Sequence, residues 1–157
     1  MNEPMKAIRY RGGIVTFRVP AHWRAELAAD GGGTFYDEAP DAGTLRLDVI
    51  TAKAPFPVSA ENAPEILAGL NRASADIERL PNGCALVRYT ESTVERGHEL
   101  LITYWVVANP IPPSHCRLAT FSYTMLERQR TDARSRRELE LIDREVRQAR
   151  FAANLGS

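Results

Sequence analysis

The sequence has little of what catalytic and metal-binding sites usually require. It holds three histidines and two cysteines in 157 residues, and none of them shows the close spacing of zinc ligands. Neither the G-x-S-x-G elbow of hydrolases nor a cysteine in a family-specific nucleophile context occurs. The acidic residues Asp37, Glu38 and Asp41 lack the alternating spacing of a calcium loop. We therefore expect no enzyme activity, no metal and no cofactor.

A net positive charge is also missing. Twenty basic and twenty acidic side chains give a formal charge of zero, so the chain lacks the positive field with which nucleic-acid-binding proteins attract phosphates. No apolar run approaches the roughly 20 residues of a membrane-spanning helix. Residues 1–10 contain no apolar stretch that could serve as a secretory signal. We expect a cytoplasmic protein with reduced Cys84 and Cys116 that binds neither nucleic acid nor membranes.

The features that are present indicate one domain, residues 1–157, with its core at about residues 14–153. The chain length and the hydrophobic fraction of 44% allow one hydrophobic core to form without disulfides or structural metals. The charged fraction of 25% is ordinary for a globular protein and argues against disorder.

Strands are predicted in the first third of the chain by alternation of apolar and polar residues. Residues 14–19 and 44–50 both alternate in this way. The glycines at 31–33 predict the tip of a short hairpin between residues 23–29 and 34–37. Because a strand-like segment follows these glycines, and not a helix, they do not form a phosphate-binding loop.

Two helices are predicted by apolar residues spaced three and four apart. The first begins at an N-cap signature formed by Asn62 and Glu65 and ends before Pro81. Its apolar stripe consists of Ile66, Leu70, Ala73, Ile77 and Leu80. The second helix runs from Asp132 to about Ala153.

The second helix is rich in arginine, and this allows two interpretations. One flank carries Arg136, Arg137, Arg144 and Arg147, which could grip an acidic partner. Acidic residues lie on the same flank, and two of these arginines follow an acidic residue by four positions, at Glu140–Arg144 and Asp143–Arg147. We favour a solvated helix face over a binding stripe.

Three longer strands are predicted between the two helices, at residues 84–93, 99–108 and 116–127. Turn residues separate them, so the simplest connection is an antiparallel meander. Both alternating sets of residues 99–108 are apolar, which predicts that both faces of this strand are covered. The order of three strands, helix, three strands, helix predicts an α+β fold with a mainly antiparallel sheet of about six strands flanked by helices.

One face of the last strand carries a row of hydroxyl groups. Thr120, Ser122 and Thr124 alternate with apolar residues, so they point to the same side of the sheet. Together with Arg88 and Tyr104 on the neighbouring strands, they form the candidate ligand-binding face. The alternative is that these hydroxyls simply lie under a covering helix.

Three segments carry a resemblance to a known family. Residues 14–23 combine a strand, Pro20 and Trp23, and they are followed by Gly43-Thr44-Leu45-Arg46-Leu47 and Phe121-Ser122-Tyr123-Thr124. The pattern resembles the PsbP and Mog-like α/β/α sandwich proteins. This group includes a photosystem II extrinsic protein, Ran-binding Mog proteins, DcrB-like bacterial proteins and adaptor chaperones of type VI secretion effectors. The resemblance spans about residues 14–153 and implies a sandwich fold in a mostly non-enzymatic group.

The missing chemistry, the apolar central strand and the resemblance together favour a non-enzymatic protein-binding module. The most specific version of this hypothesis is an adaptor or chaperone of a secreted effector. Its partner is another protein, and a homodimer is a further option. The competing hypothesis is a small-molecule-binding protein, or an unrecognised enzyme, that uses the hydroxyl-lined face. A deep cavity with convergent polar groups would favour the second hypothesis, and a flat apolar patch the first.

Overall fold

The computed structural model describes residues 3–29, 31–69 and 76–154, and these residues form two antiparallel sheets and two α-helices. The helices are α1 (Ala63–Ala68) and α2 (Ala133–Arg147). The strands are β1 (Met5–Tyr10), β2 (Val15–Pro20), β3 (Arg24–Leu27), β4 (Gly33–Tyr36), β5 (Thr44–Lys53), β6 (Ile77–Arg79), β7 (Ala85–Glu95), β8 (His98–Ile111), β9 (His115–Leu126) and β10 (Arg150–Phe151).

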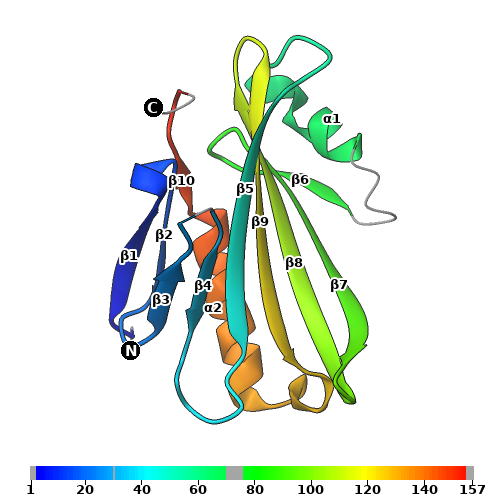
Figure 1. Cartoon of the computed structure of the whole chain (residues 1–157). Helices are drawn as coiled ribbons and strands as arrows, with labels where there is room; N and C mark the ends of the chain where they lie inside the picture. The colour runs from blue at the N-terminus through cyan, green and yellow to red at the C-terminus, as the bar shows by residue number, and fades with distance from the viewer. Residues whose placement is uncertain (1–2, 30, 70–75, 155–157) are drawn as a thin grey trace.

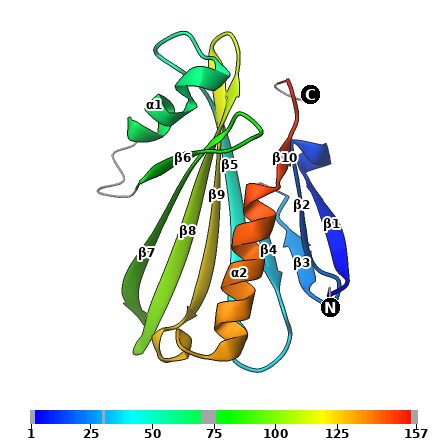
Figure 2. The ribbon, with the colours of Figure 1, turned by 180° about the vertical axis from the view of Figure 1, so that it is seen from behind.

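The two sheets differ in size (Figure 1). The larger has the order β3-β4-β5-β9-β8-β7-β6, and the smaller has the order β1-β2-β10. Helix α2 lies along the larger sheet with the smaller sheet beside it (Figure 2). Helix α1 lies at the end of the larger sheet where β8 ends and β9 begins. None of the helices in these residues is long and apolar enough to cross a membrane.

The main core fills the space between one face of the larger sheet, α2 and the smaller sheet. Alternate residues of β5, β8 and β9 point into it, as a pleated strand requires. Phe17 of β2 meets Phe35 of β4 and Phe121 of β9 edge to face, with ring centroids 5.2 Å apart in both pairs. These three rings join the smaller sheet to the larger one.

A second hydrophobic cluster lies on the opposite face, beneath α1. In β8, Val106 points into this cluster, whereas its neighbours Trp105 and Val107 point into the main core. From about Trp105 to Ala108 the strand is therefore covered on both sides, as its two apolar sets predict. The cluster consists of Val58, Ala63, Ile66, Leu67, Ala85, Val87, Val106, Ala108, Cys116 and Leu118.

This architecture confirms the predicted fold class, since a mainly antiparallel sheet lies between helices in an α/β/α arrangement. The early hairpin and the three-strand meander are also where the sequence places them. The larger sheet has seven strands where about six are predicted, and the structure holds further strands that the sequence does not predict. The sequence predicts no strand before residue 14, but β1 pairs with β2 along its whole length, because the reversal uses Gly12 and Gly13 with positive φ. These two strands and β10 form a separate sheet.

The prediction for the first helix is confirmed at residues 63–68 and wrong at its C-terminal end, where residues 77–79 form a strand. The α-helix ends at Ala68, and the predicted stripe residues Leu70 and Ala73 lie outside the described residues. Ile77 belongs to β6 and is 37% exposed, because its backbone pairs with Val87 at the edge of the larger sheet. Of the apolar residues with helical spacing, Ile66 thus lies in a short helix and Ile77 in a strand.

The start of α1 and the end of α2 also differ from the prediction. The Asn62 side chain accepts a 2.8 Å hydrogen bond from the Ser59 N–H, which caps a 3-10 turn ahead of α1, and it does not cap α1 itself. Helix α2 stops at Arg147, six residues before the predicted Ala153. The chain leaves the helix there because β10 pairs with β2.

Candidate functional site

The face of the larger sheet that bears α1 is covered only near one end. The cluster beneath α1 reaches Leu118 on β9, and the next side chain on that face, Thr120, is already half-buried and polar. Past this point the sheet presents mainly polar and aromatic side chains from β4, β5, β9, β8 and β7. We call this surface the open face; it comprises Thr34, Arg46, Asp48, Tyr89, Tyr104, Thr120, Ser122 and Thr124.

Four of the five predicted site residues lie on the open face. Ser122 is paired with Tyr104 on one side and with Arg46 on the other. Thr120 and Thr124 lie two residues before and after Ser122 on β9, so the three hydroxyls form a row along this strand on one face of the sheet. The hydroxyl row is half-buried. It belongs neither to the main core beneath α2 nor to the hydrophobic cluster beneath α1.

Arg88, the fifth predicted residue, lies on the other side of the sheet. Its guanidinium is 3.3 Å from Asp143 Oδ1 of α2 and 5.2 Å from the centroid of the Trp105 ring. The Trp105 indole donates a 3.0 Å hydrogen bond to the same carboxylate oxygen. The prediction is wrong because Arg88 pairs with Trp105 in the register, and strand alternation then directs both side chains towards α2.

Tyr89 takes the place that the sequence assigned to Arg88. Its ring stacks on that of Tyr104, with centroids 4.8 Å apart and planes 16° apart. The two residues are directly paired in the β7–β8 register. The meander itself contains the signal that could have found Tyr89, because a two-residue turn at Arg96-Gly97 fixes which residues face each other.

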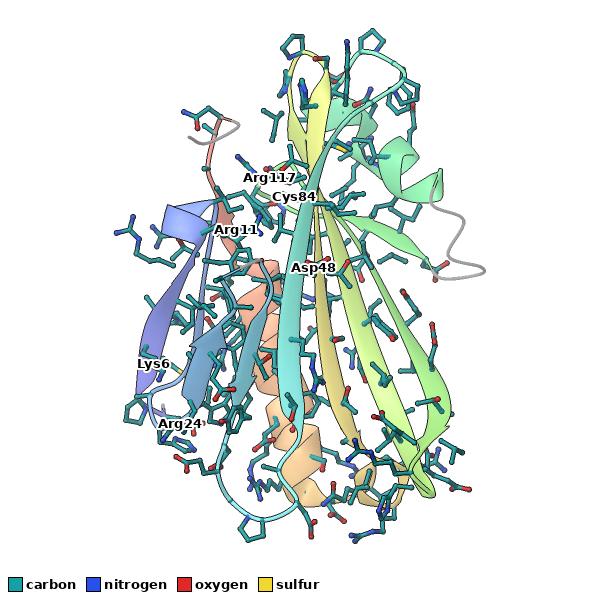
Figure 3. The ribbon with its side chains drawn as sticks, viewed as in Figure 1. Lys6, Arg11, Arg24, Asp48, Cys84 and Arg117 are labelled. Atoms are coloured by element: carbon teal, nitrogen blue, oxygen red, sulfur yellow. The ribbon has the colours of Figure 1, made fainter. Side chains whose placement is uncertain are left out.

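An open hollow of about 510 Å³ lies where the hydroxyl row meets the β3–β4 hairpin. Its polar lining includes Arg46, Asp48, Thr120 and Ser122; Figure 3 shows Asp48 on the middle of β5. In the described part of the chain, Arg46 and Asp48 form no ion pair. The lining supplies one cation, the carboxylates of Glu26 and Asp48, and hydroxyls, so it can form hydrogen bonds and ion pairs with a bound group.

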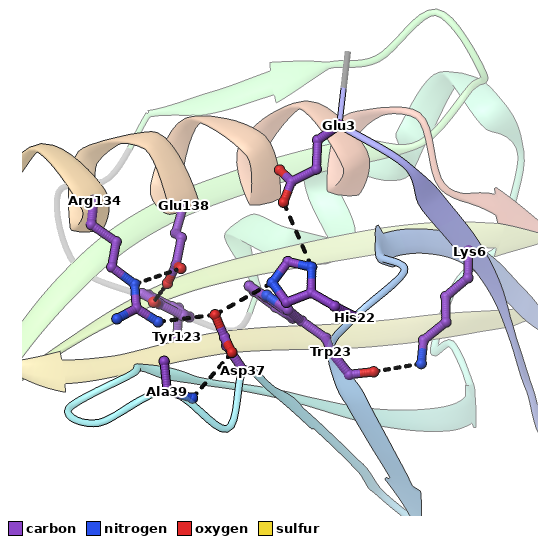
Figure 4. A network of polar contacts seen from close by, with 9 residues as sticks. All are labelled: Glu3, Lys6, His22, Trp23, Asp37, Ala39, Tyr123, Arg134 and Glu138. Atoms are coloured by element: carbon purple, nitrogen blue, oxygen red, sulfur yellow. Dashed lines mark hydrogen bonds and ion pairs between the residues drawn. The ribbon is translucent and has the colours of Figure 1, made fainter. Parts of the chain in front are cut away.

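A second polar cluster, which the sequence did not reveal, joins α2 to two loops (Figure 4). His22 Nε2 lies 3.3 Å from Asp37 Oδ2, and Arg134 lies 3.1 Å from the same oxygen. Arg134 also contacts Glu138 at 3.2 Å, and the buried Tyr123 hydroxyl donates to Glu138. These contacts fix the two loops on α2.

Two pKa shifts show how this cluster is stabilised. Burial raises the pKa of Asp37, but the Ala39 N–H, His22 and Arg134 outweigh burial and leave the pKa below its ordinary value. Burial and the neighbouring Glu138 carboxylate both raise the pKa of the Tyr123 phenol. The Tyr123 hydroxyl therefore stays protonated and keeps donating to Glu138.

We expect Tyr123→Phe to lower the free energy of unfolding by about 1–2 kcal/mol, because a buried hydrogen bond to a charged group is lost. Urea denaturation followed by circular dichroism measures this effect. Tyr36→Phe is the matched control, since Tyr36 donates to Glu26 at 3.0 Å on the exposed surface, and it should cost less than about 0.5 kcal/mol. Equal losses in the two variants would contradict the prediction.

The remaining nucleophile candidates lack the partners that catalysis requires. The Ser114 hydroxyl lies 3.1 Å from Nδ1 of its neighbour His115, but no carboxylate among the described residues contacts that histidine. Burial raises the pKa of the Cys84 and Cys116 thiols, which lowers their thiolate fraction. No group of metal-ligating side chains occurs within residues 3–29, 31–69 and 76–154.

Comparisons with known proteins relate this chain to others by structure alone. No family model matches the sequence, and no curated protein does. A crystal structure from Bacteroides thetaiotaomicron VPI-5482 superposes with a TM-score of 0.64 at 15% identity, covering 97% of this chain. This chain spans 49% of that one.

Two further solved structures are similar. The crystal structure of LpqN, described as involved in cell envelope biogenesis of Mycobacterium tuberculosis, matches with a TM-score of 0.63 at 11% identity, covering 94% of this chain and 90% of that chain. The solution structure of cyanobacterial PsbP (CyanoP) from Synechocystis sp. PCC 6803 matches with a TM-score of 0.40 at 13% identity, covering 97% and 95%. At these identities the likeness to LpqN and to the Bacteroides protein shows the fold.

Proposed function

We propose that this protein is a non-catalytic protein-binding module that docks its partner on the open face. The observation that carries the proposal is the uneven cover of the larger sheet, since α2 and the smaller sheet cover one face, whereas α1 covers only one end of the other. An antiparallel sheet can leave one face to solvent, and the uncovered part of this face carries the stacked aromatic pair Tyr89 and Tyr104. A partner protein would complete the missing layer.

The side chains of the open face are suited to a protein partner. The stacked pair Tyr89 and Tyr104 offers large rings whose flexibility is already restricted, and tyrosine is enriched at protein interfaces for this reason. The hydroxyl row provides hydrogen-bonding groups, and Arg46 and Asp48 provide opposite charges that select the partner's orientation. An adaptor or chaperone of a secreted effector, acting in the cytoplasm, is the specific form that the sequence resemblance favours.

A small-molecule ligand is the second candidate function, and one observation favours it. Arg46, Asp48, Thr120 and Ser122 converge on the hollow of about 510 Å³, which lies within the size range of ligand pockets. The hollow is open to solvent, however, whereas small-molecule sites bury most of the ligand's surface. We therefore rank the protein partner first.

Site-specific photocrosslinking tests the proposed function. A photoreactive phenylalanine analogue replaces Tyr104 on the open face or, as the control, Arg136 on the exposed side of α2. In a lysate of the source organism we expect a defined protein adduct from position 104 only, suppressed by excess unlabelled protein and by Arg46→Glu. The same adducts at both positions, or none at position 104, would show that the open face does not dock a protein. A small molecule found in native mass spectra and lost with Arg46→Glu would support the second candidate instead.

A further inference from the structure

Among the described residues, most of the outer edge of β7 in the larger sheet has no paired strand. The outer strand β6 covers only its first three residues, where Ile77, Glu78 and Arg79 pair with Val87, Leu86 and Ala85. From Arg88 to Glu95, β8 is the one described strand that pairs with β7. Proteins usually keep unpaired edge strands very short. This edge of eight residues is longer than a typical whole strand of about 5–6 residues.

The hairpin turn determines which backbone groups face outwards along this edge. Arg96 and Gly97 both have positive φ, 52° and 80°, which is the geometry of a two-residue type I′ turn. Such a turn makes its flanking residues, Glu95 and His98, a hydrogen-bonded pair. Backbone groups alternate in direction along a strand. The N–H and C=O groups that point away from β8 therefore belong to Arg88, Thr90, Ser92 and Val94.

The same alternation sorts the side chains of the edge. Tyr89, Glu91, Thr93 and Glu95 lie on the side of the open face, and the two glutamates are exposed and form no ion pair among the described residues. On the α2 side, Val94 is 67% exposed. A strand added along the edge would continue the open face, with its own side chains next to Glu91 and Glu95.

A second copy of this chain fits the edge poorly. Two antiparallel copies can form hydrogen bonds only if outward-facing residues lie opposite each other, and then Glu91 and Glu95 of both copies gather on one side of the joined sheet. Like charges on neighbouring strands destabilise the pairing. The unpaired carboxylates instead match an occupant with basic side chains at the same spacing.

We infer that the edge of β7 from Arg88 to Glu95 is a strand-addition site for an extended segment of a partner protein that carries Lys or Arg four residues apart. The backbone groups of Arg88, Thr90, Ser92 and Val94 supply the affinity. Glu91 and Glu95 supply the selectivity, because residues four apart on a strand point to the same side. The inference rests on the proposed function. It specifies that the docking segment of the partner is extended and carries two basic residues four positions apart.

A labelled nine-residue peptide of alternating Thr and Val, with Lys at positions 3 and 7, serves as the probe. Fluorescence anisotropy measures its binding to the full chain. The matched control peptide has the same composition with Lys at positions 3 and 6, which places the two charges on opposite sides. We expect the first peptide to bind about tenfold more tightly than the second, and N-methylation of its alternate amides to abolish binding.

Two variants of the chain locate the binding. Ser92→Pro removes an N–H that points away from β8, so it should block the edge and leave the β7–β8 ladder in place. The double variant Glu91→Lys, Glu95→Lys should lose the Lys peptide and bind the same peptide with Glu at positions 3 and 7. Because both glutamates are exposed, this second variant keeps the test valid if Ser92→Pro disturbs folding.

Equal binding of the two Lys peptides, or binding that neither variant changes, would overturn the inference. A dimer in sedimentation velocity that Ser92→Pro converts to a monomer would also overturn it, since the edge would then hold a second copy. The proposed function has a separate readout. If the peptides fail and the adduct at position 104 persists, only the strand-addition site is wrong, whereas loss of that adduct removes the docking function itself.

Discussion

Replacing Phe17 with alanine will lower the free energy of unfolding by about 3–5 kcal/mol, the cost of removing a buried phenylalanine ring. The side chain is 3% exposed and contacts two other aromatic rings, Phe35 and Phe121. Each edge-to-face pair adds about 0.5–1.5 kcal/mol beyond the burial of area. The expected loss is a large part of the about 5–15 kcal/mol that usually stabilises a domain.

The position of Phe17 gives this variant a structural signature as well. The ring joins the smaller sheet to the larger one, so its loss should loosen β1, β2 and β10 before the meander β7–β9. Urea unfolding measures the stability, and hydrogen exchange measures the local opening. Leu27→Ala is the control, because Leu27 is exposed, and it should change stability by less than about 0.5 kcal/mol. Equal protection of both sheets in Phe17→Ala would contradict the expected order of opening.

The parts of the fold that the sequence predicted are those whose neighbours in the sheet follow directly in the chain. The meander from β7 to β9 is closed by two short turns, so its register follows from turn position and alternation. In β9 the hydroxyls Thr120, Ser122 and Thr124 were placed correctly on one face for the same reason. Local pattern and tertiary structure agree in this region.

The errors occur where distant segments decide the structure. Helical spacing in residues 62–80 gave no sign that Ile77 would pair with β7, because an edge strand takes its hydrogen bonds from a partner and not from its own sequence. The end of α2 was missed likewise, since β10 is defined by its pairing with β2. Arg88 was assigned to the wrong face because its position relative to the hydroxyl row depends on the register through β8.

Helix α2 supplies the second large effect, through the buried carboxylate of Glu145. Its side chain is 4% exposed and accepts two hydrogen bonds from Arg18, at 2.8 and 2.9 Å, and one from Arg144 at 3.1 Å. Breaking a fully buried ion pair costs about 3–5 kcal/mol. Arg18 and Arg144 are half-exposed and can be hydrated again, so we expect Glu145→Ala to cost about 2–3 kcal/mol at neutral pH.

The pH dependence of stability distinguishes this charge effect from a packing effect. Burial raises the pKa of Glu145, but Arg18 and Arg144 outweigh burial and leave the pKa below its ordinary value of 4.5. A carboxylate with a lowered pKa in the folded state stabilises the protein above its unfolded pKa, and this contribution is lost as the pH falls through the folded value. The stability difference between the wild type and Glu145→Gln should therefore be full at pH 7 and shrink steadily below about pH 4.5.

Chemical denaturation at several pH values between about 3 and 7 measures this difference. Glu140→Gln on the exposed side of the same helix is the control, because Glu140 forms no ion pair among the described residues, and its difference from the wild type should stay near zero at every pH. A difference between the wild type and Glu145→Gln that persists unchanged at acid pH would mean that Glu145 stabilises α2 through packing. The link between α2 and β2 would then not depend on its charge.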